Sequence, residues 1–147
     1  MRSHPIIALF SLIALSVAPV SAVTRTVTIE APATVVAGAS VAVTVAASTD
    51  AMGGEQIGFF HAQYSLDDGK TWTSFCFDEA LGGSASRSTQ FTAGPAGSKA
   101  LVRVRVAFRG GKASDVDFTG APIKWEGSWG KWLTPPTRMT AIKVVAG

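Results

Sequence analysis

The chain has 147 residues, and its 13 Lys and Arg outnumber its 10 Asp and Glu to give a formal net charge of +3. The cations form no run along the sequence, whereas nucleic-acid-binding proteins concentrate theirs in a patch or stripe, so we predict no nucleic-acid partner. The single cysteine excludes an intramolecular disulfide. Because 47% of the residues are hydrophobic, the chain can still bury a core of its own.

Residues 1–22 have the pattern of a secretory signal. A mildly basic start precedes the apolar run PIIALFSLIALSV. The small residues Val20 and Ala22 occupy the two positions before the cleavage site that signal peptidase recognises. The run is shorter than the about 20 apolar residues that span a bilayer. We expect cleavage after Ala22 and one domain, residues 23–147, that is secreted, periplasmic or at the cell surface with no membrane span. An uncleaved membrane anchor is the alternative.

From residue 23 onward, apolar and polar residues alternate with period two between glycine and proline breaks, which predicts a small all-β domain. The first expected strands lie in TVTIEAP (26–32) and SVAVTVAAS (40–48). Two more lie in GFFHAQYSL (58–66) and TWTSFCF (71–77). In the last of these we interpret Cys76 as a buried small hydrophobe, with an intermolecular disulfide as the alternative.

The middle of the chain gives weaker signals. FDEALGG (77–83) can form one short helical turn, and the serine-rich residues 82–90 read mostly as loop before a short strand at 87–91. LVRVRVAF (101–108) is a clear strand that is half buried, with Arg103 and Arg105 on its polar face. After a three-residue hairpin loop, Asp115 and Asp117 of the next strand would face these arginines as a solvated ladder.

The region from residue 121 to 147 adds a tryptophan-rich hairpin and a final strand near 140–145. The tryptophans can stack on sugar rings or cover the open end of the domain, and we favour the cover because Trp side chains usually bury most of their area. The candidate ligand-binding residues of the first interpretation are Trp125, Trp129, Trp132, Lys124, Glu126 and Lys131.

The stretch SLDDGKTW (65–72) joins two expected strands and predicts a hairpin turn. Asp67 can accept hydrogen bonds from backbone N–H groups ahead of it, and Gly69 supplies a positive φ angle. Trp72 can fold back over the turn and bury its ring. We expect five residues to build this structural turn: Ser65, Asp67, Gly69, Thr71 and Trp72.

These eight residues match the Asp-box (BNR-like) pattern position by position. Asp-boxes recur in sialidases and other propeller enzymes away from the catalytic centre, and they also occur singly in secreted β-sandwich domains. The rest of the chain from residue 23 resembles bacterial immunoglobulin-like or fibronectin-III-like modules. The resemblance implies an immunoglobulin-like antiparallel β-sandwich, here extended by the tryptophan-rich hairpin and the final strand.

No convincing catalytic, cofactor or metal site is visible. Asp67 and Asp68 lack the spaced oxygen ligands of a calcium loop, and adjacent carboxylates on an exposed turn lack the pocket that tunes catalytic pKa values. His61 is the only histidine after residue 22, which excludes a conventional histidine-rich zinc site. A hydrolase using Glu126 with Asp115 or Asp117 is a third hypothesis that the small size of the domain disfavours.

These observations predict a non-enzymatic, secreted structural, adhesive or self-assembling module with no cofactor. The alternative is a carbohydrate-binding module that uses the three tryptophans. The expected partners are a polysaccharide or a protein at the cell surface, or a second copy of the chain that pairs with an exposed edge at the first or last strand.

Overall fold

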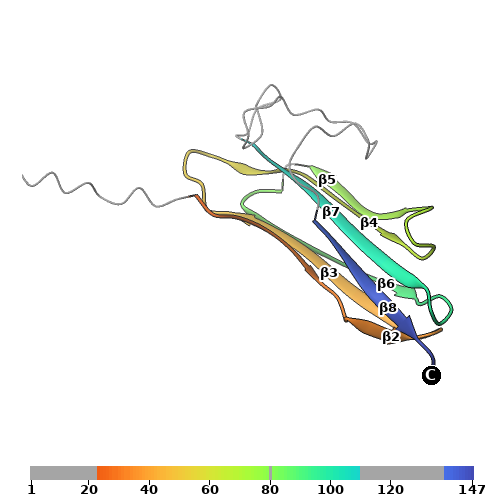
Figure 1. The fold of residues 1–147 in the computed structure, drawn as a ribbon. Coiled ribbons are helices and arrows are strands. Elements are labelled where there is room, and N and C mark those ends of the chain that lie inside the picture. The colour runs from red at the N-terminus through yellow and green to blue at the C-terminus, as the bar shows by residue number, and fades with distance from the viewer. Residues whose placement is uncertain (1–22, 80, 110–137) are drawn as a thin grey trace, which may run out of the picture.

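The computed structural model describes residues 23–79, 81–109 and 138–147 (Figure 1). This part of the chain is all-β, and it contains no helix long and apolar enough to cross a bilayer. Its eight strands are β1 (Arg25–Glu30), β2 (Thr34–Val36), β3 (Ser40–Thr49), β4 (Gln56–Ser65), β5 (Thr73–Glu79), β6 (Ser84–Thr92), β7 (Lys99–Arg109) and β8 (Arg138–Val145).

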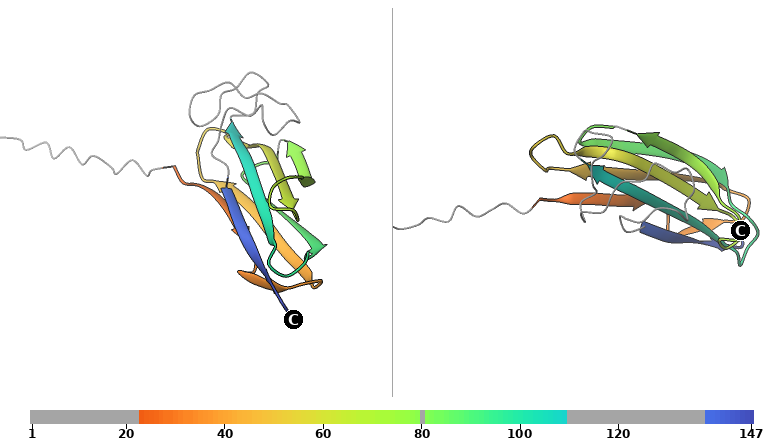
Figure 2. Two further views of the ribbon diagram at one scale, coloured as in Figure 1. Left: turned by 45° about the vertical axis from the view of Figure 1, so that its right-hand side comes forward. Right: turned by 90° about the horizontal axis from the view of Figure 1, so that it is seen from above.

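The strands form two sheets that pack face to face (Figure 2). The three-stranded sheet has the order β1-β3-β6, and the five-stranded sheet has the order β2-β8-β7-β4-β5. All pairs are antiparallel except β2 with β8, which run parallel over three residue pairs. β1 and β2 are separated by only three residues, so the chain changes sheets at residues 31–33.

The alternation of valines explains the shared core. Val43 of β3 is 1% exposed, and Val102, Val104 and Val106 of β7 are 0% exposed, because every second side chain of a strand points to the same face. Burying each of these side chains stabilises the fold by about 1.5–3 kcal/mol relative to leaving it in water. The valines of the two sheets belong to one contiguous cluster, as the sequence pattern predicts.

β4 is buried on both of its faces along much of its length. Phe60 points into the core and is 0% exposed, while its neighbours Phe59 and His61, on the opposite face, are 1% and 2% exposed. β4 lies between β7 and β5, and its pairing with β5 shifts register between Ala62 and Gln63. The most buried strand of the fold therefore carries a histidine on its outer side.

Two sequence-based boundaries are wrong. β6 begins at Ser84, so most of the serine-rich segment is strand, and β5 continues through Asp78 and Glu79 where a helical turn was a candidate. β-pairing decides both cases: Asp78 lies opposite Phe60, and its carboxylate binds Arg87 Nε of β6 at 2.8 Å. Local propensity is weaker than these non-local contacts.

The final strand pairs back into the fold as expected, although it is not a sheet edge. β8 lies between β2 and β7, which removes the exposed edge that the self-association hypothesis assigned to it. β1 is an edge of the three-stranded sheet, so that part of the hypothesis stays a prediction.

Cys76 is buried, with 8% of its surface exposed, and its Sγ lies 4.0 Å from the Phe60 carbonyl oxygen. Burial raises the pKa of the thiol to about 11, so the group stays protonated at neutral pH. The interpretation as a buried small hydrophobe is confirmed.

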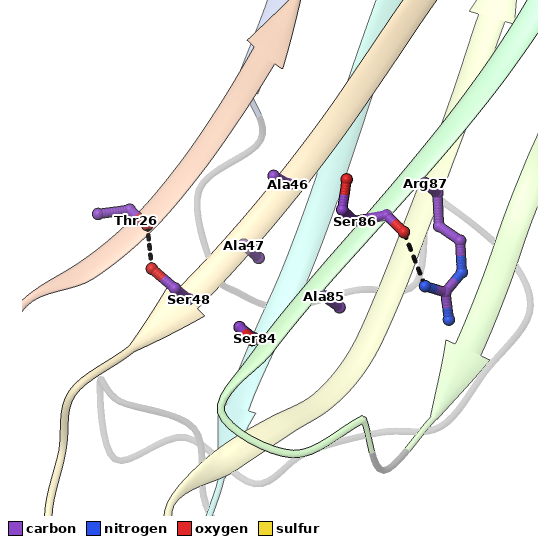
Figure 3. A pocket seen from close by; sticks show the side chains of 8 residues that line it. All are labelled: Thr26, Ala46, Ala47, Ser48, Ser84, Ala85, Ser86 and Arg87. Carbon is purple, nitrogen blue, oxygen red and sulfur yellow. Dashed lines mark hydrogen bonds between the residues drawn. The ribbon is translucent and has the colours of Figure 1, made fainter.

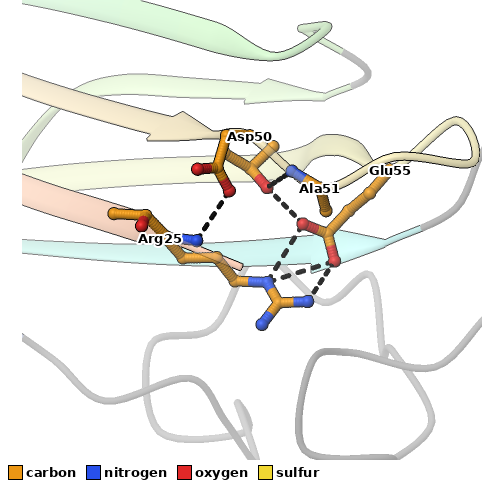
Figure 4. A network of polar contacts seen from close by, with 6 residues as sticks. Arg25, Asp50, Ala51 and Glu55 are labelled. Carbon is orange, nitrogen blue, oxygen red and sulfur yellow. Dashed lines mark hydrogen bonds and ion pairs between the residues drawn. The ribbon is translucent and has the colours of Figure 1, made fainter. Parts of the chain in front are cut away.

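A polar network holds the start of β1 against the connection between β3 and β4 (Figure 4). Arg25 Nη2 binds Glu55 Oε1 at 2.6 Å, and the Thr49 hydroxyl donates to the same carboxylate. The Thr24 N–H donates to Asp50 Oδ1 at 2.6 Å. Burial raises the pKa of Glu55, and the hydrogen bonds from Arg25 and Thr49 outweigh it, so that the pKa lies below its ordinary value.

Several predictions concern residues outside the described ranges. They are the secretory signal at 1–22, the aspartates of the expected ladder, the tryptophan-rich hairpin, and the candidate ligand-binding residues Trp125, Trp129, Trp132, Lys124, Glu126 and Lys131.

Candidate functional site: the cationic face of the five-stranded sheet

The turn between β4 and β5 lies at one end of this sheet and is built around Asp67. Asp67 Oδ1 accepts from the Thr71 N–H and from the Ser65 hydroxyl, each at 2.8 Å, and Oδ2 accepts from the Thr71 hydroxyl at 2.5 Å. Hydrogen bonds from the Thr71 hydroxyl, the Thr71 N–H and Ser65 lower the pKa of Asp67 to about 2. Gly69 has a φ of 86°, and an added β-carbon there would lie 3.5 Å from Trp72 Cζ2. Each of these turn residues therefore has a local structural role.

The turn places Trp72 beneath an arginine of β7. The guanidinium carbon of Arg103 lies 3.7 Å from the centroid of the Trp72 ring, in a cation–π arrangement. Arg103 Nε donates to Gln63 Oε1 at 2.9 Å, and Gln63 Nε2 donates to Ser74 Oγ at 3.0 Å. The Arg103 guanidinium is thus held by both a ring and an amide.

His61 continues this polar chain into the sheet. Its Nε2 shares a hydrogen bond of 2.9 Å with Ser74 Oγ, and its ring meets Phe77 edge-on at 5.1 Å between centroids. Burial and then the positive charges of Arg103 and Arg105 lower its pKa from 6.5 to about 4. His61 is therefore neutral at neutral pH, and the positive charge of this region belongs to β7 and β8.

Four cations point away from the core on two adjacent strands, and we call this surface the cationic face: Lys99, Arg103 and Arg105 of β7 and Lys143 of β8. Lys99 and Lys143 are exposed and lie directly opposite one another in the β7–β8 register. Like charges in that relation destabilise a sheet. Burial lowers the pKa of both arginines, and the charge of Arg105 lowers that of Arg103 further.

The strands around the cationic face provide no opposite charge of their own. β2, β4, β7 and β8 contain no Asp or Glu within the bounds that the structure describes. The acidic residues of the described strands lie elsewhere, in β1 at Glu30 and in β5 at Asp78 and Glu79. The cations of this face therefore lie on β7 and β8, whereas Glu79 of β5, opposite Phe59, lies toward the other edge of the same sheet. Asp67 and Asp68 of the β4–β5 turn line a hollow together with Lys99.

The outer face of the three-stranded sheet is different in kind. A shallow hollow there is lined by small side chains of β1, β3 and β6, among them Thr26, Ala46, Ser48 and Ser86 (Figure 3). The Thr26 and Ser48 hydroxyls share a hydrogen bond across β1 and β3, and Arg87 Nη1 donates to the Ser86 carbonyl oxygen at 2.8 Å. This face is polar and largely uncharged.

Sequence reasoning found only part of the candidate site. It placed Arg103 and Arg105 together on the polar face of one strand, but it did not connect them with Lys99 or Lys143. Folding brings together lysines that are far apart in sequence, so the absence of a cationic run did not exclude a cationic surface. No group of three or more His, Cys, Asp or Glu that could hold a metal ion occurs among the described residues.

No protein-family model matches this chain, and no curated protein is similar to it. Among solved structures, a superoxide reductase (neelaredoxin) from Ignicoccus hospitalis is similar over 83% of this chain and 82% of its own, with 15% identity and a TM-score of 0.49. Spo0M, a sporulation control protein from Bacillus subtilis, is similar over 87% of this chain and 51% of its own, with 14% identity and a TM-score of 0.35.

This comparison corrects two predictions. The sequence analysis predicts a non-enzymatic structural, adhesive or self-assembling module and no enzyme; the comparison does not uphold either prediction, since the first similar structure is that of a superoxide reductase. The physical reason is that a fold does not fix function, so an all-β pattern without a recognisable catalytic motif does not indicate a structural role. The similarity is too weak to transfer the reductase activity to this chain.

Proposed function

We propose that this chain is an exported, immunoglobulin-like β-sandwich that binds an anionic ligand on the cationic face. The observation that carries the proposal is the like-charge pair Lys99 and Lys143, which is extended along β7 by Arg103 and Arg105. Fold stability alone does not favour this arrangement, because the opposed lysines repel one another. An anion bound between the two lysines would be attracted to both of them and would offset their mutual repulsion.

The architecture supports a surface that is organised before the ligand arrives. Arg103 is held by Trp72 and Gln63, so its positive charge is fixed near the exposed lysines before an anion binds. The β7 strand separates successive outward side chains by about 6.8 Å, a spacing that suits several negative groups on one ligand.

The test measures binding of long-chain inorganic polyphosphate by titration calorimetry at two salt concentrations. The face variant is Lys99→Gln with Lys143→Gln. Its control is Thr28→Glu with Ser86→Glu, which makes the same change in net charge on the exposed outer face of the other sheet.

We expect the face variant to bind at least about tenfold more weakly than the control, because each basic residue near an anionic surface contributes about 1 kcal/mol. The unaltered protein should lose affinity as salt rises from about 50 mM to 200 mM. Equal weakening in the face variant and the control would refute the proposal, since net charge would then explain the binding.

A further inference from the structure

Exposed apolar side chains lie among the cations of the cationic face. Met139 of β8 is opposite Arg103 of β7 and is 61% exposed. Ala141, also exposed, is opposite the half-buried Leu101, and the next outward residue of β8 is Lys143. Cationic and apolar positions therefore lie side by side on the same two strands.

A soluble anion would gain from the cations but would leave Met139 in water. The surface of an anionic bilayer uses both kinds of side chain, because its headgroups attract Lys and Arg while its acyl boundary accepts apolar groups. Trp72 lies next to this area and is only half buried, and tryptophan is enriched at membrane–water interfaces.

The geometry also suits a broad, shallow partner. Outward side chains of neighbouring strands leave a sheet on the same side, so Lys99, Lys143 and Met139 share one face. The Arg103 guanidinium lies over Trp72 at the edge of this area. Lys99 and Arg103 are separated by four residues of β7, or about 13 Å along the strand, which exceeds the width of a single phosphate group. Several lipid headgroups would be contacted together.

We propose that the cationic face docks on the surface of an anionic lipid bilayer, with Lys99 and Lys143 at the headgroups, the charge of Arg103 behind them and Met139 inserted between the headgroups. This inference rests on the proposed anion binding and names its partner. It requires no membrane-spanning segment, because the face binds from one side of the bilayer.

The experiment measures co-sedimentation of the purified protein with vesicles of phosphatidylcholine containing about 30% phosphatidylglycerol, and with vesicles of phosphatidylcholine alone. The key variant is Met139→Ser. Its matched control is Met52→Ser, which removes a methionine that is 93% exposed in the connection between β3 and β4. Any contribution from residues 1–22 is common to both variants.

We expect Met139→Ser to reduce partitioning onto anionic vesicles at least about threefold, and Met52→Ser to leave it unchanged. Met139→Ser should not alter affinity for polyphosphate, since that affinity depends on charge. The variant Lys99→Gln with Lys143→Gln should weaken binding to both probes.

The outcomes separate the inference from the proposed function. Polyphosphate binding without vesicle binding would overturn the lipid inference and leave anion binding in place. Equal partitioning of Met139→Ser and Met52→Ser, or equal binding to vesicles without phosphatidylglycerol, would also overturn it. Loss of binding to both probes in the unaltered protein would refute both proposals.

Discussion

The two sheets contribute to one core but differ on their outer faces. The three-stranded sheet presents small hydroxyl and methyl side chains that satisfy one another, as Thr44 and Ser88 do at 2.8 Å across β3 and β6. The five-stranded sheet presents opposed lysines, a stacked arginine and a buried histidine. The hydroxyl groups of the first surface bind one another, whereas the second retains the repulsion between Lys99 and Lys143. One packing scaffold can therefore carry two outer faces of different chemistry, because only the inward side chains form the shared core.

The largest effect should come from the core that both sheets share. Phe60→Ala removes a fully buried ring and should lower the free energy of unfolding by about 3–5 kcal/mol. Urea denaturation followed by circular dichroism and by tryptophan fluorescence would measure it. If the sheets form one cooperative unit, both signals should change at the same urea concentration. Two separate transitions would contradict the picture of a common core.

The next largest effect should come from lowering the pH, because His61 on the five-stranded sheet changes its protonation state when the protein unfolds. Below pH 6.5 the unfolded chain protonates this histidine, while the folded state keeps it neutral to about pH 4. Stability should therefore fall as pH drops from 6.5 to 4, by up to about 1.4 kcal/mol per pH unit. The measurement is the urea midpoint as a function of pH.

His61→Gln is the control for that titration, since an amide can keep a hydrogen bond to Ser74 without taking up a proton. The variant should have a flatter stability profile between pH 6.5 and 4. Asp67 affects stability at lower pH: its pKa of about 2 means that its contribution to the free energy of unfolding is lost only as pH falls below 4. An unchanged slope in His61→Gln would rule out this histidine as the cause.

A smaller effect is expected where the start of β1 is fastened. Glu55→Gln replaces the carboxylate that Arg25 contacts in a partly exposed ion pair, and it should cost about 1 kcal/mol. Thermal melting at low and high salt would measure the loss, which should shrink at high salt because solvent ions screen the pair. A loss of stability that does not depend on salt would indicate that Glu55 acts through packing and not through its charge.

The smallest effect has the opposite sign. Lys99→Gln relieves the repulsion with Lys143 and should stabilise the protein by about 0.3–0.5 kcal/mol. Arg138→Gln, at an exposed position of β8 opposite Val104, removes the same charge without an opposed cation and should change stability less. Destabilisation by Lys99→Gln would show that the cationic face is not strained and would weaken the contrast between the sheets.

How far the sequence predicts this molecule depends on how local each feature is. Alternating valines located β3 and β7 and their buried faces, because period two is a property of neighbouring residues. Residues 84–86 of β6 were missed since their one inward position, Ala85, carries no strong apolar signal. The pairing of Lys99 with Lys143 depends on which strands are adjacent, and that is decided by the whole fold.

The parallel pairing of β2 with β8 also has a mechanical consequence. β2 lies near the start of the described chain and β8 at its end, joined by hydrogen bonds that include Ala37 N–H to Val145 O at 2.9 Å and Lys143 N–H to Ala33 O at 3.0 Å. Tension applied between these two ends would pull parallel neighbours in opposite directions along their length. The hydrogen bonds between β2 and β8 would then be loaded together in shear. Antiparallel neighbours that are pulled from one end can instead break their hydrogen bonds one at a time. The short β2 strand thus works as a mechanical clamp.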